Sequence, residues 1–347
     1  MRPLFVFGTG LSALVLATGA VRLAQTLEAE RLGQALPADA REKALAAIEE
    51  FDSEPGLEAL QWVSIGPSPI TGGQIGVTLG TRPMSGRVTA LAVHPNDPNR
   101  WLAGGAQGGV WETMNAGATW APKTDNQPSL AMGAIAYAKS NPTIIYAGTG
   151  EANFSRDSYC GAGVLKSVDG ALTWTRPAGT TLSRGSFSDI IVDPSNANVV
   201  LASVGRCVFG QGWVGIPPGR AVAGVHKSTD GGATWSLKLA FGPRPASTLT
   251  ADPTDFNRQY AAIAESLASD GNVYRSMDAG DTWSLIAGPW VGAPLGVGRI
   301  ELAIAPSNPN RVFVSVATGG SSSVMNGLFF TDNAWATTPV WTSISMT

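Results

Sequence analysis

The sequence predicts an all-β fold in which four-stranded antiparallel sheets repeat as the blades of a β-propeller. Three observations predict it. The 347 residues include 42 glycines and 23 prolines, too many turn-forming residues for a chain dominated by long helices. Hydrophobic residues make up 44% of the chain, enough to bury a substantial core. An eight-residue pattern ending in Thr-Trp recurs every 48 to 61 residues, which is typical of a repeat architecture.

The repeated pattern is a hydroxyl residue, any residue, Asp or Asn, any residue, Gly, any residue, Thr and Trp. Copies begin at Thr113, Ser167, Ser228 and Ser276, and a degenerate copy begins at Thr331. A Pro- and Asn-rich tight turn precedes each copy and lies between two short apolar runs. Each unit therefore contains four expected strands, and we expect five recognisable blades.

The repeated pattern has a structural explanation. Its hydroxyl and carboxylate can accept hydrogen bonds from turn amides, and its glycine can take a positive φ without strain. The closing tryptophan is expected to pack between sheets, where one ring removes a large apolar area from water. We therefore interpret these residues as structural rather than catalytic. They are Asn115, Trp120, Asp169, Trp174, Asp230, Trp235, Asp278 and Trp283.

These copies resemble the Asp-box, or BNR, repeats of sialidases, xyloglucanases, sortilin-type receptors and photosystem II assembly factors. The resemblance covers residues 62 to 345. More narrowly, four segments resemble the start of secreted bacterial proteins described as sortilin-like or glycosyl-hydrolase-like repeat proteins. These segments are residues 62–67, 85–95, 108–111 and 146–151. The resemblance implies the propeller fold and leaves several functions open.

The chain divides into three expected parts. Residues 1–21 are expected to be a signal peptide, because Arg2 precedes an apolar run that ends in small residues. An uncleaved membrane anchor is the alternative. Residues 22–58 are a spacer with a helix from Ala38 to about Phe51, and residues 59–347 form the propeller. We expect the protein to be secreted, periplasmic or on the cell surface, with membrane contact only through an uncleaved N-terminal segment.

Closure of the ring is a separate question. The segment Trp62-Val-Ser-Ile resembles Trp341-Thr-Ser-Ile, so it looks like an outermost strand without the three strands that precede it. The fifth unit already contains Trp341. Either five blades close with an extra strand, or the ring is larger than five. We expect an incomplete or gapped ring.

Composition excludes several partners and cofactors. Charged residues make up only 14% of the chain and the net charge is −3, which argues against a nucleic-acid partner. Two histidines offer no zinc constellation, and we expect no metal and no cofactor. Calcium in the loop from Glu151 to Asp157 is the weighed alternative, although no ligand spacing demands it. Cys160 and Cys207 form one candidate disulfide in an oxidising compartment, against two separate thiols.

Strand direction places the long second-to-third-strand loops and the blade connections on one face, called the top. Arg87, Asp189 and Arg299 begin innermost strands and should ring the channel mouth. Mixed carboxylates, guanidiniums and aromatic rings suit sugar or peptide recognition. The candidate ligand-binding residues are Arg87, Glu151, Asn153, Arg156, Asp157, Tyr159, Arg206, Trp213 and Arg299.

Three functions compete. We favour a noncatalytic role in which the top face binds a polysaccharide or an extracellular protein. The alternative is a glycoside hydrolase, which needs two carboxylates across a sugar. Glu151 with Asp157 or Glu265 is the candidate pair. A sortilin-like or assembly-factor-like scaffold is the third.

Two departures from the resembling enzymes argue against catalysis. Xyloglucanases carry an Asp just before the Gly-Gly of the first blade, where this chain has Ala106-Gln107-Gly108-Gly109. Sialidases need a Phe-Arg-Ile-Pro-like segment, and no Phe-Arg-Ile-Pro occurs here.

Overall fold

The computed structural model describes residues 40–52, 86–153, 158–179, 181–205, 221–240, 244–264, 270–291, 296–319 and 324–344. The chain forms two compact units, Met1–Phe51 and Asp52–Thr347. The expected spacer helix is present as α2 (Ala40–Asp52). The expected signal segment lies outside the described residues. Among the described helical residues, no stretch is both long and apolar enough to cross a bilayer.

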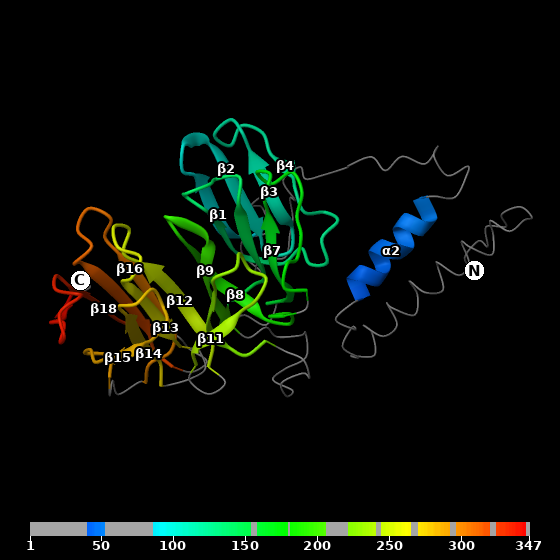
Figure 1. Cartoon of the computed structure of the whole chain (residues 1–347). Helices are drawn as coiled ribbons and strands as arrows, with labels where there is room; N and C mark the ends of the chain where they lie inside the picture. Colours follow the sequence, from blue (N-terminus) through cyan, green and yellow to red (C-terminus); the bar gives the residue numbers. More distant parts are fainter. Residues whose placement is uncertain are drawn as a thin grey trace, which may run out of the picture. The chain divides into compact units, whose positions relative to one another are not determined.

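The second unit is an all-β arrangement of five antiparallel sheets, which we call blades 1 to 5 in chain order (Figure 1). Consecutive strands pair within each blade, so every blade is a meander. Blade 1 contains β1 (Val88–His94), β2 (Asp97–Gly105), β3 (Gly109–Thr113) and β4 (Ala121–Pro122); blade 2 contains β5 (Met132–Tyr137), β6 (Ile145–Gly150) and β7 (Cys160–Ser167). Blade 3 contains β8 (Ser186–Asp193), β9 (Asn196–Gly205), β10 (Gly224–Ser228) and β11 (Ser236–Leu239). Blade 4 contains β12 (Ala246–Ala251), β13 (Gln259–Ile263), β14 (Asn272–Ser276) and β15 (Ser284–Ile286); blade 5 contains β16 (Ile300–Ile304), β17 (Val312–Ala317), β18 (Met325–Thr331) and β19 (Thr342–Ser343).

The observed sheets confirm the predicted β-propeller of five blades. Blade 2 has three strands, and one bridge between Lys166 and Thr175 stands where its fourth strand is expected. The innermost strands contact one another in the order β1, β5, β8, β12, β16. No sheet in the described part of the chain closes on itself. The segment at Trp62, on which the closure question depends, lies outside the described residues.

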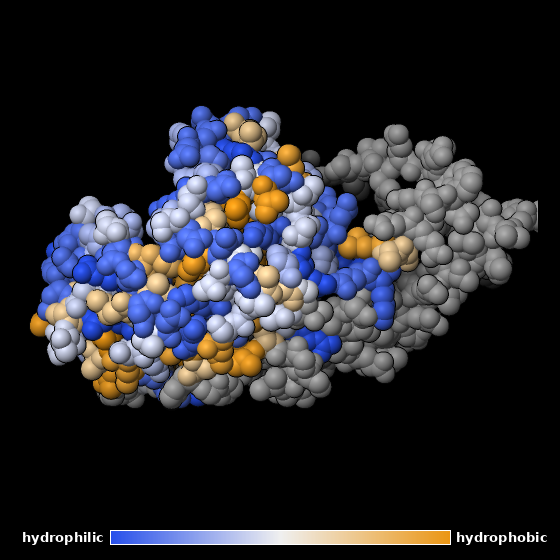
Figure 2. All heavy atoms as spheres, viewed as in Figure 1, coloured by the Kyte–Doolittle hydropathy of each residue, from blue (hydrophilic) through white to orange (hydrophobic). Residues whose placement is uncertain are grey.

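The hydrophobic core lies between the blades rather than within one sheet. Each of the four apolar clusters combines side chains from two consecutive blades. Leu102 and Val110 of blade 1, for example, pack with Ile145 and Leu165 of blade 2. Both faces of an interior blade are therefore apolar, which explains the low fraction of charged residues. On the face shown in Figure 2, the outer surface is mostly hydrophilic with separate apolar groups.

The repeated eight-residue segment forms the turn expected of it, and we call it the repeat turn. In blade 3, Ser228 Oγ donates to Asp230 Oδ1 at 2.8 Å and accepts from the amide of Gly232 at 2.8 Å. The amide of Thr234 donates to Asp230 Oδ1 at 2.9 Å. Gly231 and Gly232 have φ values of +73° and +88°. These short-range hydrogen bonds explain why the same residue types recur in each blade.

The closing tryptophans differ in burial, which corrects one expectation. Trp174, Trp235 and Trp283 each pack in the cluster that their blade shares with the preceding blade. Trp120 is 38% exposed, so its expected packing between sheets is wrong. The physical reason is its place in blade 1, which has no preceding blade among the described residues.

Candidate functional site

A β-bulge interrupts the innermost strand of each of blades 1 to 4. The pairing with the second strand shifts at Thr89, Gly133, Ser188 and Ser247. A bulge leaves one residue out of the ladder and redirects its side chain. In blade 5 the innermost strand has no such shift. Its Glu301 pairs with Ser315 and takes the position of Asp189, which follows the bulge of blade 3 and pairs with Ser203.

The bulge residues connect neighbouring blades. Thr89 Oγ1 donates to the carbonyl of Met132 at 2.5 Å, Ser188 Oγ to that of Ala246 at 2.9 Å, and Ser247 Oγ to that of Ile300 at 2.8 Å. At the bulge of blade 2 the two strands approach too closely for any side chain. A Cβ at Gly133 would lie 1.9 Å from the carbonyl oxygen of Phe187 in blade 3. The five innermost strands therefore converge closely around one axis.

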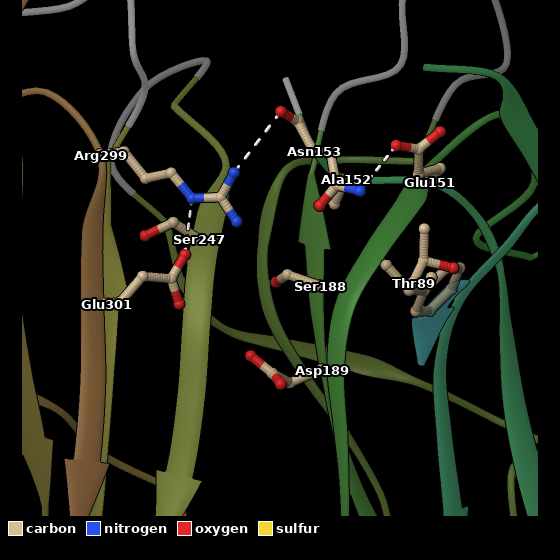
Figure 3. Close-up of a pocket in the computed structure, with 11 residues that line it drawn as sticks. Thr89, Glu151, Ala152, Asn153, Ser188, Asp189, Ser247, Arg299 and Glu301 are labelled. Atoms are coloured by element: carbon tan, nitrogen blue, oxygen red, sulfur yellow. Dashed lines mark hydrogen bonds and ion pairs between the residues drawn. The ribbon is translucent and has the colours of Figure 1, made fainter. Parts of the chain in front are cut away.

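A cavity of about 200 Å³ lies where these strands converge (Figure 3). Its lining is almost entirely polar, and all five blades contribute to it. The residues that line it are Thr89, Gly133, Glu151, Ala152, Asn153, Phe187, Ser188, Asp189, Ser247, Arg299 and Glu301. Three carboxylates and one guanidinium thus share one small space.

Glu151 is fully buried at the end of β6, and its charge is compensated. Arg87, just before β1, donates from its guanidinium to Glu151 Oε2 at 2.5 Å. Asn153 Nδ2 donates to Glu151 Oε1 at 2.7 Å. A buried carboxylate with an ion-pair partner and a second donor is held in one position. Its geometry suits holding Arg87 and Asn153 in place at the cavity.

Asp189 is a different kind of carboxyl. It follows the bulge at Ser188 on β8, and its Oδ2 accepts a hydrogen bond of 2.9 Å from the amide of Leu249 in blade 4. Burial raises the pKa of Asp189 from 3.8 to about 7. The negative charge of Glu301 raises this pKa further, while the Leu249 amide and the positive charge of Arg299 oppose the rise. A substantial fraction of Asp189 is therefore protonated at neutral pH.

Glu301 faces the same cavity from β16 and is ion-paired. Arg299 Nε lies 2.6 Å from Glu301 Oε1, and Arg299 NH1 lies 3.5 Å from the carbonyl oxygen of Asn153. Figure 3 shows Arg299 reaching across the top of the cavity between these two partners. Asp189 and Glu301 therefore face one cavity in different environments. Burial favours the acid form of Asp189, whereas Glu301 lies beside the Arg299 cation. Two carboxyl groups that face one cavity are the candidates for a proton donor and a proton acceptor.

The structure brings together some of the predicted site residues. Glu151, Asn153, Asp189 and Arg299 line the cavity, and Arg87 reaches it through its ion pair with Glu151. Tyr159 is exposed and does not line it; its carbonyl accepts from the amide of Glu151. The remaining candidates lie outside the described residues. They are Arg156, Asp157, Arg206, Trp213 and Glu265.

Sequence reasoning missed Glu301 and the hydroxyls of Ser188 and Ser247. The signal that could have found Glu301 is the alignment of the innermost strands, in which Glu301 takes the place of Asp189. The two serines share the bulge position with Thr89. Cys160 is disulfide-bonded, and its expected partner Cys207 lies outside the described residues. Within the described ranges, no cluster of His, Cys, Asp and Glu side chains could hold a metal ion.

Comparison with curated proteins gives two xyloglucanases. No family model matches the chain. A xyloglucanase of Hypocrea jecorina is 26% identical over 241 residues, which cover 58% of this chain and 26% of that protein. A xyloglucanase of a Paenibacillus species is 26% identical over 220 residues, which cover 53% of this chain and 19% of that protein. This chain therefore spans about a quarter or less of the curated relatives it matches.

Solved structures agree on the fold. The crystal structure of an ancestral GH74 enzyme matches with a TM-score of 0.56 and 20% identity, over 75% of this chain and 31% of that chain. The GH74 xyloglucanase from Xanthomonas campestris matches with a TM-score of 0.51 and 19% identity, over 72% of this chain and 38% of that chain. The second unit is thus a β-propeller similar to those of glycoside hydrolases.

Proposed function

We propose that this chain is a glycoside-hydrolase-like propeller that binds a polysaccharide at its central cavity and cleaves it there. The observation that carries the proposal is the pairing of Asp189 with Glu301 in one polar cavity, with Arg299 beside Glu301. The similarity to two xyloglucanases supports a polysaccharide substrate and makes xyloglucan the first to test.

The roles follow from the two environments. Asp189 in its acid form donates a proton to the glycosidic oxygen as the bond to the anomeric carbon breaks. A water molecule attacks the anomeric carbon, and Glu301 accepts the proton that this water releases. Arg299 holds Glu301 in place through their ion pair. Thr89, Ser188 and Ser247 bring hydroxyl groups to the cavity wall, beside which sugar hydroxyls could bind.

The test measures new reducing ends released from xyloglucan, a mixed-linkage β-glucan and a mannan by the purified chain. We expect release from at least one polymer, and a loss of 100-fold or more in Asp189→Asn and in Glu301→Gln, since general acid–base catalysis contributes about 10²–10⁴-fold. Asp193→Asn is the matched control, because Asp193 ends the same strand as Asp189 and does not line the cavity. Equal activity in all four proteins would refute the assignment.

Binding without cleavage is the second candidate function. It is favoured by Ala106 and Gln107, which stand between β2 and β3 where the resembling xyloglucanases carry a carboxylate, and by the charge compensation of Glu151. Retention of a polymer on affinity gels with no new reducing ends would support this function against the first. The extracellular protein partner and the secreted location stay predictions.

A further inference from the structure

The two innermost strands that carry a cavity carboxyl group share a feature of their pairing. Asp189 pairs with Ser203 in blade 3, and Glu301 pairs with Ser315 in blade 5. At the same register of the other three blades the innermost strand has no carboxyl group, and its partner is glycine or alanine. These pairs are Ala90 with Gly104, Ala134 with Gly148, and Thr248 with Ala262. At this register of the five described blades, a serine therefore lies opposite the two carboxyl residues and opposite no other residue.

Ser203 is fully buried on β9 and binds the backbone of Asp189. Its Oγ accepts a hydrogen bond of 2.8 Å from the Asp189 amide. The Ser203 hydroxyl lies 2.6 Å from Ser188 Oγ and 3.2 Å from the carbonyl oxygen of Asp189. Ser188 gives its own hydroxyl hydrogen to the carbonyl of Ala246 in blade 4, so Ser203 is the donor at the shorter contact. A chain of hydrogen bonds thus runs from the Asp189 amide through two serines to blade 4.

The carboxyl group of Asp189 is attached to the same strand of blade 4. Its Oδ2 accepts from the Leu249 amide at 2.9 Å, and the Thr248 side chain also hydrogen-bonds to the carboxyl group. Both residues belong to β12, where the chain of hydrogen bonds from Ser203 also ends. Asp189 is therefore fixed to one neighbouring strand through its carboxyl group and, by way of Ser203, through its backbone. Figure 3 shows the carboxyl group of Asp189 on the side of the cavity toward Glu301.

The bulge itself does not require this hydroxyl. Blade 4 forms the same kind of bulge with Ala262 in the place of Ser203, and blade 1 forms one with Gly104 there. Neither of these blades has a carboxyl group directly after its bulge. The feature that accompanies the hydroxyl of Ser203 is therefore the carboxyl group of Asp189.

We propose that Ser203 is a positioning residue of the site: its hydroxyl fixes the backbone of Asp189, so that the carboxyl group stays against blade 4 and faces the cavity. Ser203 does not line the cavity and acts only through Asp189. The inference rests on the proposed function, in which Asp189 donates the proton. Without the hydroxyl, the Asp189 amide loses this acceptor, the bulge relaxes, and the carboxyl group is free to leave β12 for water.

The first measurement needs no substrate. Carbon-13 NMR of the full chain follows the pKa of Asp189, and the Asp189→Asn variant identifies the carboxyl signal. Burial is the largest cause of the rise of this pKa to about 7. In Ser203→Ala we expect the pKa to fall by about one pH unit or more, because a carboxyl group that reaches water loses the effect of burial. Glu301 and Arg299, the charged groups that act on Asp189, are the same in both chains.

The second measurement uses the polysaccharide that the unmodified chain cleaves. Ser203→Ala should lower kcat about tenfold or more, because a misplacement of about 1 Å can cost about 10²-fold. KM should stay nearly unchanged, since Ser203 does not line the cavity. The alkaline limb of the pH profile of kcat should move to lower pH together with the pKa of Asp189.

Ser276→Ala is the matched control. Ser276 is also a buried serine whose Oγ accepts a backbone amide at 2.8 Å, that of Gly280, and it does not line the cavity. Circular dichroism should show both variants folded, since Ala262 already occupies the place of Ser203 in blade 4. The control should lose stability while the pKa of Asp189 and kcat stay those of the unmodified chain.

The two measurements can fail separately. An unchanged pKa of Asp189 in Ser203→Ala, or an equal change in Ser276→Ala, would overturn the role of Ser203 whether or not the chain is an enzyme. A lowered pKa in a chain that cleaves none of the tested polymers would refute the proposed hydrolysis and would still support the placement of Asp189 by Ser203.

Discussion

The guanidinium of Arg87, just before β1 of blade 1, lies 2.5 Å from the carboxylate of Glu151, which is fully buried directly after β6 of blade 2. The pair joins two blades at the rim of the central cavity. It also separates the roles of the cavity carboxyl groups. Glu151 has an ion-pair partner, whereas among the described residues no ion pair is found for Asp189, which accepts a hydrogen bond from the Leu249 amide.

Removing Arg87 should cost more than removing the charge of Glu151. Arg87→Ala leaves a buried carboxylate that has, among the described residues, only Asn153 as a side-chain donor, and breaking such a pair from one side costs about 3 kcal/mol. Glu151→Gln leaves a partly exposed guanidinium that water can solvate. Urea unfolding of both variants and of the double variant checks this. Equal losses in the two single variants would contradict it.

Gly133→Ala should be strongly destabilising. Its Cβ would lie 1.9 Å from the carbonyl oxygen of Phe187 and 2.3 Å from that of Gly150, and both are backbone atoms. Overpacking of this kind costs about 3 kcal/mol. Ser188→Ala is the control at the equivalent bulge, where the hydroxyl loses its hydrogen bonds to Ser203 Oγ and to the carbonyl of Ala246, at a cost of about 1 to 2 kcal/mol. Thermal unfolding should rank Gly133→Ala well below Ser188→Ala.

The parts of the fold that sequence could predict are those set by short-range contacts. The repeat turn is one, since Ser228, Asp230 and Thr234 bond within seven residues of one another. The exposure of Trp120 was not predictable from its own turn. A closing tryptophan is buried by the blade that precedes its own, and blade 1 has no preceding blade among the described residues. The cavity was found only in part. Glu301 lies five residues before Pro306, as Asp189 lies five before Pro194, but other blades have Ala90 or Thr248 there, so no recurring motif marks the position.

The repeat turns should weaken in acid. The side-chain hydroxyl and amide of Thr234, with Ser228, lower the pKa of Asp230 to about 2, below its ordinary 3.8. A pKa lowered in the folded state contributes stability that is present above about pH 4 and is lost as the pH falls through 2. Asp230→Asn copies the turn of blade 1, where Asn115 donates to Thr119. Its melting temperature, relative to the unmodified chain, should therefore rise as the pH falls from 4 to 2.

Asp189 should have the opposite effect on stability. Its pKa is raised in the folded state, so the folded chain binds more protons than the unfolded chain between about pH 4 and pH 7. Stability therefore falls as the pH rises through this window. Asp189→Asn removes the titrating group, and its melting temperature relative to the unmodified chain should increase from pH 4 to pH 8. A constant difference across that range would contradict the raised pKa.

The measurement that tests the central claim most directly compares two substrates in the Asp189→Asn variant. One is the polysaccharide that the unmodified chain cleaves, and the other is a dinitrophenyl glycoside of the same sugar, whose leaving group needs no proton. If Asp189 is the proton donor, the variant loses at least 100-fold in kcat/KM on the polysaccharide and little on the dinitrophenyl glycoside. An equal loss on both substrates would contradict that role.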